Sequence, residues 1–264
     1  MRKMLEGRVI IVLGAGPSLG HATAMMCTEE GASVVLAARS RDVVDSLAAE
    51  VEAKGGSALP VVCDMTKVED CEALAAAAVE RYGRVDGLVA IGYMPADNKT
   101  ISEVDDDFDN WKSIVDTNLF GTLQVIKPLV AQMSRQEQGG SIVIINSMNS
   151  HNPWPRGLPY AASKAGLASA TRTLAIEFGR QQIRVNSLHC GAIVNDALWV
   201  SLDNLAKARG TTKEEEYQRI ADMGALGWLP TPEEYVGSVL YLLSDLSKPV
   251  TGISLHVNAG RFMT

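Results

Sequence analysis

The chain is poor in the features that mark metal-binding and secreted proteins. Its 264 residues include only four cysteines, Cys27, Cys63, Cys71 and Cys190, with no Cys-x-x-Cys pair among them. Their spacing matches no set of metal ligands, so no metal site is expected. Thiols without a disulfide framework are typical of a cytoplasmic protein, which is the location we expect.

Basic runs and long apolar runs are also missing. The formal net charge is −7 and no lysine/arginine cluster occurs, so we expect neither nucleic acid nor a membrane surface as a partner. No apolar stretch reaches the roughly 18 residues that a membrane span needs. The N-terminus is basic, but the apolar run after it meets Gly14 within a few residues. This pattern predicts a first strand and not a signal peptide.

No internal repeat and no linker-like change in composition divides the chain, so we expect a single domain over residues 1–264. The acidic stretch 94–110 lacks the glycine and the closing glutamate of a calcium loop, and it is interpreted as solvated surface. Hydrophobic residues make up 47% and charged residues 21%, as in ordinary soluble globular proteins.

Short apolar runs alternate with helical patterns along the chain. Seven of these runs predict strands, at residues 8–13, 32–38, 58–63, 86–91, 141–146, 183–188 and 254–257. Helices are expected between most of them, at residues 21–27, 41–54, 68–82, 108–133, 159–179 and 233–243. The alternation predicts an α/β fold, a Rossmann-type doubly wound sheet of about seven parallel strands with helices on both faces.

The first predicted strand runs into a glycine-rich turn that precedes a helix. Backbone N–H groups and the helix dipole at such a turn attract an anion. The spacing G-x-G-x-x-x-G is one residue longer than the dinucleotide fingerprint, so an ordinary glycine-rich turn stays an alternative. Its position at the first strand favours pyrophosphate binding, with Gly14, Gly16, Ser18, Leu19 and Gly20 as the candidate residues.

The residues after the second predicted strand bear on the choice of cofactor. An acidic residue that would hold a ribose 2′-hydroxyl is missing there, and Arg39 stands in the region instead. Because a guanidinium matches a phosphate in fork geometry, this favours NADP(H), with NAD(H) as the alternative. Alternatively, Ser40 caps the next helix and the arginines are solvated. Asp64, after the third strand, could bind an adenine amino group or cap the helix that follows.

A tyrosine and a lysine four residues apart, Tyr160 and Lys164, open one of the predicted helices. Residues at i and i+4 share a helix face, so both side chains point into the same space. A nearby ammonium is expected to lower the pKa of the phenol from its usual value of about 10 toward the operating pH. Ser147 ends a buried strand, where it can donate a hydrogen bond to a substrate oxygen.

Several motifs, in order, resemble a short-chain dehydrogenase/reductase of the classical type over nearly the whole chain. They are GAGPSLG (14–20), CDMT (63–66), TNLFGT (117–122), SIVIINSMNS (141–150), YAASK (160–164), IRVNSLHCG (183–191) and TGISLHVNAG (251–260). The resemblance implies catalytic roles. Tyr160 would be the acid or base, Ser147 would orient the substrate, Lys164 would hold the nicotinamide ribose, and Asn118 would hold a water that relays protons.

The resemblance also implies cofactor contacts and an assembly. The glycines would lie along the pyrophosphate, Asp64 and Met65 would flank the adenine, and Ile193 would contact the nicotinamide carboxamide. A homotetramer would form through the helices of Trp111 and Tyr160 and the last strand. The chain departs from the family pattern at Ser18, at Cys190 and Asn195, and at Ala90-Ile91-Gly92-Tyr93, where only backbone contacts to the cofactor, as at Ala90, are expected.

We therefore expect an NAD(P)-dependent enzyme that interconverts a secondary alcohol and a ketone by hydride transfer. Enoyl reduction is disfavoured, because those relatives separate tyrosine and lysine by six residues and position 167 is a leucine. A dinucleotide-binding regulator without turnover is the alternative from another class. Residues 195–228 are expected to form a substrate lid, although Trp199 and Trp228 are equally well explained as helix anchors. An apolar substrate is expected from Met148, His151, Trp154, Trp199 and Trp228.

Overall fold

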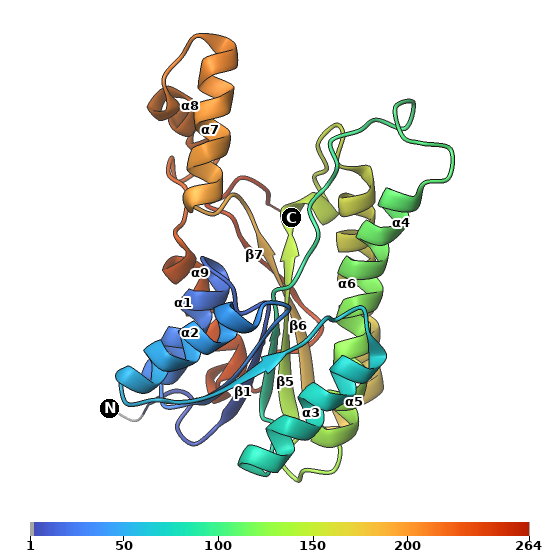
Figure 1. Cartoon of the computed structure of the whole chain (residues 1–264), viewed down its shortest axis with the longest axis vertical. Helices are drawn as coiled ribbons and strands as arrows, with labels where there is room; N and C mark the ends of the chain where they lie inside the picture. Colours follow the sequence, from blue (N-terminus) through green and yellow to red (C-terminus); the bar gives the residue numbers. More distant parts are fainter. Residues whose placement is uncertain (1–2, 264) are drawn as a thin grey trace.

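Seven parallel strands form one central sheet in the order β3-β2-β1-β4-β5-β6-β7 (Figure 1). This computed structural model describes residues 3–263. The strands are β1 (Val9–Leu13), β2 (Ser33–Ala38), β3 (Ser57–Val62), β4 (Gly87–Ala90), β5 (Gly140–Ser147), β6 (Ile183–Cys190) and β7 (Ser254–Val257). The strand order reverses between β1 and β4, and open α/β sheets bind ligands beyond the strand ends at such a point.

Helices cover both faces of the sheet (Figure 1). One face carries α1 (Leu19–Glu29), α2 (Arg41–Ala53) and α9 (Pro232–Leu243). The other carries α3 (Val68–Tyr82), α5 (Thr122–Met133) and α6 (Leu158–Phe178), and α4 (Asp109–Val115) packs against α6. The fold class predicted from the alternation of strand and helix patterns is confirmed.

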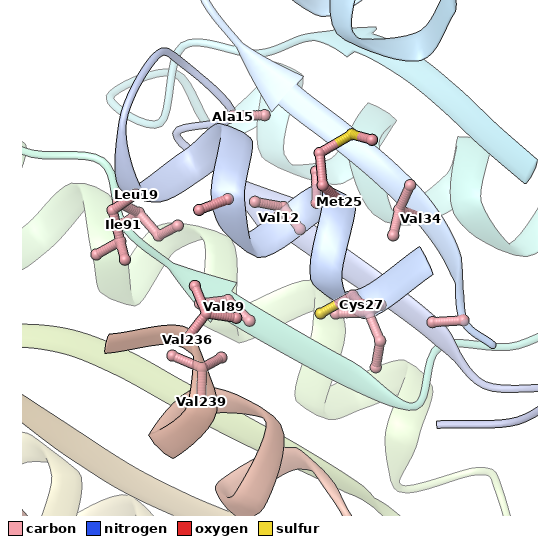
Figure 2. Packing of buried hydrophobic residues seen from close by; sticks show 14 of the residues in the cluster. Val12, Ala15, Leu19, Met25, Cys27, Val34, Val89, Ile91, Val236 and Val239 are labelled. Atoms are coloured by element: carbon pink, nitrogen blue, oxygen red, sulfur yellow. The ribbon is translucent and has the colours of Figure 1, made fainter. Parts of the chain in front are cut away.

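The strands are apolar throughout because they are buried on both faces. All five residues of β1 are buried, and their side chains alternate between two separate cores. In the first core, Val89 of β4 lies beside Val236 and Val239 of α9, and Val12 of β1 lies under α1 (Figure 2). Burying a valine or leucine fully contributes about 1.5–3 kcal/mol, so the two cores hold the sheet and its helices together.

The predicted helix over 108–133 is not a single α-helix. It consists of α4, a π-helical stretch Asp116–Gly121, and α5. Asn118 lies in this stretch, and its carbonyl accepts a 2.8 Å hydrogen bond from the Thr122 hydroxyl. Apolar periodicity does not distinguish the wider π turn from an α turn, so the π-helical stretch could not be predicted from it.

The region predicted to be a lid forms two helices, α7 (Asp196–Arg209) and α8 (Lys213–Ala221), that project beyond the sheet (Figure 1). Trp199 of α7 stacks on Tyr217 of α8, with ring centres 5.5 Å apart and planes 13° apart. Glu216 is fully buried between the two helices and accepts a 2.8 Å bond from Arg209. Trp199 therefore anchors the two helices to each other. Among residues 3–263, no helix is long and apolar enough to cross a membrane.

Candidate functional site

A cavity of about 470 Å³ lies where the carboxyl ends of the central strands meet. The glycine turn after β1 forms one wall, and the segments after β4, β5 and β6 form the others. Its lining comes from Gly14, Pro17, Ser18, Leu19, Gly20, Ile91, Gly92, Tyr93, Ile145, Asn146, Ser147, Tyr160, Lys164, Cys190, Gly191, Ile193, Asn195, Ala197 and Leu198. The cavity thus lies at the switch point that the strand order defines.

Ser147, Tyr160 and Lys164 all line this cavity. Ser147 is the last residue of β5, and its hydroxyl accepts a 3.2 Å bond from the Asn149 N–H. Tyr160 and Lys164 lie one turn apart on α6. The Lys164 ammonium lies 5.7 Å from the ring centre of Tyr160 and donates a 2.9 Å bond to the Ile145 carbonyl. The structure therefore brings together the three side chains that the sequence predicted to meet.

The electrostatics of the pair differ from the expectation. Burial raises the pKa of Tyr160, and the neighbouring Ser147 hydroxyl lowers it by less. Burial also lowers the pKa of Lys164 to about 8. The expectation that Lys164 would lower the pKa of the phenol was wrong for this structure, because taking the phenolate out of water is the largest effect. The phenol is therefore protonated at neutral pH.

Asn118 is fully buried and does not line the cavity. Its side-chain oxygen accepts a 2.6 Å bond from the N–H of Met94, and its amide donates to the Met94 carbonyl at 2.9 Å. The same amide donates to the Ser163 hydroxyl at 3.2 Å. The side chain therefore fixes the segment after β4 against α6, beside the wall that Tyr93 forms.

The glycines of the turn differ in what they do. A Cβ at Gly14, where φ is +87°, would lie 2.6 Å from the Gly92 nitrogen, and one at Gly20 would lie 2.2 Å from the Gly14 oxygen. Both positions exclude a side chain because the backbones approach so closely. A Cβ at Gly16 would meet nothing within 4 Å, so packing within the chain does not require that glycine. A dinucleotide phosphate against the turn would require it, and the residues present fit such a group.

Ser18 occupies a glycine-like conformation, with φ 75° and ψ −125°. Its hydroxyl accepts a 3.1 Å bond from the side-chain amide of Asn195, the residue that precedes α7. The Asn195 oxygen caps α7 by accepting from the Leu198 N–H at 2.9 Å. The departures from the family pattern at positions 18 and 195 are therefore in contact with each other.

The residues expected to hold the adenosine half lie outside the cavity. Arg39 is exposed, and its charge contributes to lowering the pKa of Asp64. Asp64 does not cap α3; its carboxylate accepts from the N–H and hydroxyl of Thr66, at 3.0 and 2.7 Å. Ser40 makes no side-chain cap to α2 either. The Met65 side chain is buried in the core and Ala90 is buried at the end of β4, so neither offers its side chain to a ligand.

The cavity has an aromatic wall that sequence reasoning did not place. The ring of Tyr93 lies edge-on to that of Tyr160, with centres 6.2 Å apart and planes at 69°, and the Lys164 ammonium lies 6.0 Å from its centre. The prediction of which residues contact the substrate was wrong. None of Met148, His151, Trp154, Trp199 and Trp228 lines the cavity, whose apolar wall is instead Ile193, Ala197 and Leu198.

A buried polar network lies behind Ser147. The two ring nitrogens of His189 are each 2.9 Å from a serine hydroxyl, those of Ser150 and Ser187. Ser150 donates to the Ser147 carbonyl at 2.8 Å, and the Asn146 amide bonds both Ser187 and the Lys164 carbonyl. Burial lowers the pKa of His189 to about 3, so this ring is neutral and the network keeps one arrangement.

Comparison with known proteins agrees with this geometry. A family model described as enoyl-(acyl carrier protein) reductase matches residues 14–261. The short chain dehydrogenase/reductase astE of Aspergillus oryzae is 35% identical over 97% of this chain and 95% of its own length. The dehydrogenase/reductase SDR family member 4 of Sus scrofa is 33% identical over 98% of this chain and 88% of its own.

Solved structures of the same fold contain NADPH. L-Sorbose reductase from Gluconobacter frateurii, complexed with NADPH and L-sorbose, superimposes with a TM-score of 0.92, at 26% identity over 100% of both chains. An actinorhodin polyketide ketoreductase variant with NADPH has a TM-score of 0.88, at 30% identity over 99% of both chains. With a dinucleotide turn and a serine, a tyrosine and a lysine in one cavity, the chain belongs to the short-chain dehydrogenase/reductase family. It is an oxidoreductase of the NAD(P)-binding type.

Proposed function

We propose that the protein interconverts a secondary alcohol and a ketone by hydride transfer, with Tyr160 as the general acid/base. The observation that supports this most strongly is the shared cavity of Ser147, Tyr160, Lys164 and the glycine turn. When bound, the nicotinamide of NAD(P) supplies or accepts the hydride. Gly14, Gly16 and Gly20 would hold its pyrophosphate, with Ser18 and Leu19 in the same turn and Ile193 on the opposite wall.

In the reduction direction each side chain has one task. The Ser147 hydroxyl donates a hydrogen bond to the substrate oxygen, and Tyr160 delivers its proton to that oxygen. Because burial keeps the phenol protonated, Tyr160 starts in the form that this step needs. The Lys164 ammonium stabilises the phenolate that remains. Asn118 would hold the water that returns the proton, as the family resemblance implies, while its side chain also bonds Met94 and Ser163.

Replacing Tyr160 with phenylalanine tests the assignment. Tyr160→Phe keeps the ring in place and removes only the proton donor, so turnover should fall below about a tenth of wild type while cofactor affinity changes little. Tyr82→Phe is the matched control, because its hydroxyl bonds Ser57 on β3. A Tyr160→Phe enzyme that retains more than a tenth of the rate, on any ketone reduced by the wild type, would refute the role.

The description of the matching family model favours enoyl reduction, but the residues of the site do not. That chemistry, in the relatives the sequence resembles, uses a lysine seven positions after the tyrosine. Here that position is Leu167, which is 1% exposed and belongs to the core. A panel of ketones and enoyl thioesters separates the two reactions, and cofactor binding without oxidation of NADPH on any of them would favour the regulator without turnover.

We propose NADP(H) as the preferred cofactor, with NAD(H) as the alternative. The support is the exposed guanidinium of Arg39 after β2, although Asp64 lies close enough to compete for it. Titration of the protein with NADPH and NADH should show tighter binding of NADPH, and Arg39→Ala should reduce that preference. Tighter binding of NADH by the wild type would mean that the assignment is wrong.

The substrate, the lid and the assembly are also proposals. An apolar alcohol or ketone fits the wall of Ile193 and Leu198, and residues 195–228 would close over it as a lid because Ala197 and Leu198 line the cavity.

A homotetramer is supported by three exposed apolar residues on α6 and the π-helical stretch, Leu158, Ile176 and Phe120. Light scattering should give four times the chain mass of 28.2 kDa. A cytoplasmic location is supported by the four free, buried cysteines.

A further inference from the structure

Three of the four histidines of the chain meet at one place that is separate from the cavity lining. His189 of β6 and His256 of β7 are direct partners across the two strands, and His151 follows β5. One nitrogen from each ring lies within 4.8 Å of those from the other two. The convergence is built by the sheet, because β5, β6 and β7 are neighbours although these histidines are far apart in the sequence.

One nitrogen of the cluster lacks a partner. The Nδ1 atom of His256 is buried and, among the described residues, has no hydrogen-bond partner. A buried polar atom left in this state costs about 1–3 kcal/mol, so folded proteins seldom keep one without a bound water or ion. This atom points to a ligand that the chain itself does not supply.

His189 is already held as a metal-ligating histidine would be. The Ser150 hydroxyl donates its hydrogen bond to the Ser147 carbonyl, so the Ser150 oxygen must accept from the Nδ1–H of His189. The free lone pair of the His189 ring is therefore on Nε2. Metal ligands of this type usually donate their other ring N–H to a fixed oxygen, which sets the tautomer. The Ser187 hydroxyl on Nε2 is a single neutral hydrogen bond that a cation can displace.

We propose that His151, His189 and His256 form a binding site for a borderline divalent transition metal, with zinc as the representative ion. Three imidazoles without a carboxylate suit zinc, nickel or cobalt and not magnesium or calcium. Two nitrogens on one tetrahedral zinc lie about 3.3 Å apart, from bonds of about 2.0 Å. The rings must therefore close by at most roughly 1.5 Å, and the exposed side chain of His151 can turn to do so.

The competing explanation is aromatic packing alone. His151 stacks on Phe262, with ring centres 5.8 Å apart and planes 3° apart, and it also stacks on His189 at 5.3 Å and 27°. Parallel rings do not direct their in-plane lone pairs at one point, so the packed arrangement has to change when a metal binds. The two explanations therefore differ in what happens when a metal is added.

Zinc titration of the full chain separates them. After treatment with a chelator and dialysis, calorimetry should show one saturable Zn²⁺ site per chain, and the thermal midpoint should rise with Zn²⁺ but not with Mg²⁺. His151→Ala and His256→Gln should each weaken the site by about tenfold or more. His21→Ala is the matched control and should bind like wild type, because His21 is the fourth histidine and pairs with Glu50.

The proposal fails if no saturable site is found, or if His151→Ala binds zinc like wild type. His151 is exposed, so that variant should fold and decides the matter even if His256→Gln does not. Visible absorption of bound Co²⁺ gives a readout that does not depend on enzyme activity. A spectrum that is the same in wild type and His151→Ala would assign the ion to another part of the chain and overturn the site.

Discussion

The side-chain amide of Asn195 donates a 3.1 Å hydrogen bond to the hydroxyl of Ser18, although the two residues are 177 positions apart. Asn195 stands at the start of α7 and Ser18 stands in the glycine turn. The oxygen of the same amide caps α7 through the Leu198 N–H. One side chain thus joins the base of the two projecting helices to the turn that would carry the cofactor phosphates.

This contact predicts an unusual order of stability at position 18. Ser18→Ala loses the hydrogen bond and keeps φ at 75°, so it should lower the free energy of unfolding by about 0.5–1.5 kcal/mol. Ser18→Gly loses the same bond but relieves a backbone conformation that costs about 1–3 kcal/mol in a residue with a Cβ. Urea unfolding should find the glycine variant more stable than the alanine variant; the reverse order would show that the backbone is unstrained.

The buried ammonium of Lys164 predicts a pH-dependent stability. Its pKa is lowered from 10.5 to about 8, so between these values the unfolded chain binds more protons than the folded one. The contribution of Lys164 to the free energy of unfolding should therefore rise with pH from about 8 to 10.5. Below pH 8 the full penalty is present, about 3 kcal/mol at 1.36 kcal/mol for each pKa unit.

Lys164→Met tests this effect because it nearly keeps the length of the side chain without its charge; the bond to the Ile145 carbonyl is lost with the ammonium, at every pH. Urea unfolding at pH 7 should find Lys164→Met more stable than wild type by up to about 3 kcal/mol, with the difference shrinking toward pH 10.5. Burial raises the pKa of Cys27 to about 12, so the contribution of this thiol to the free energy of unfolding falls as the pH rises above 9. Both proteins contain that thiol, so it cancels in the difference; a difference independent of pH would contradict the prediction.

Asn118 is predicted to hold the segment after β4. Asn118→Ala removes both bonds to Met94 and the bond to Ser163 from a fully buried position, so stability should fall by about 2–4 kcal/mol. Hydrogen exchange at the Met94 amide should accelerate more than exchange in β5. Asn110→Ala is the control, since its amide makes an exposed bond to Asp97. Equal protection of Met94 in both variants would rule out the clamp.

The sequence was sufficient for the parts of the structure that depend on local pattern. Continuous apolar runs such as that of β1 predicted buried parallel strands, and the spacing of Tyr160 and Lys164 placed both side chains on one helix face. Ser147 joined them because strand ends meet at one edge of a parallel sheet. These inferences needed only the periods of helix and strand and the position of a residue at the end of a strand.

What depends on distant contacts was not predictable in the same way. The π-helical stretch around Asn118 has the same apolar periodicity as an α-helix. The histidine cluster involves three strand ends, and its members show no ligand spacing in the sequence. The aromatic residues expected at the substrate were misplaced because a tryptophan on a helix gives no sign of what it packs against, as Trp199 on Tyr217 shows. The pKa of Tyr160 depends on burial, which the sequence alone does not measure.

Tyr93 is predicted to act on substrate binding and not on proton transfer. The residue is 58% exposed and its ring lies edge-on to Tyr160 in the cavity wall, so an apolar substrate would pack against it. An aromatic contact of this kind contributes about 0.5–1.5 kcal/mol, and Tyr93→Ala should raise KM for an apolar ketone about 2- to 12-fold with little change in kcat. Tyr93→Phe keeps the ring and should behave like wild type. If Tyr93→Phe instead lowers kcat as far as Tyr160→Phe does, the hydroxyl of Tyr93 takes part in proton transfer and the division of roles between the two tyrosines is wrong.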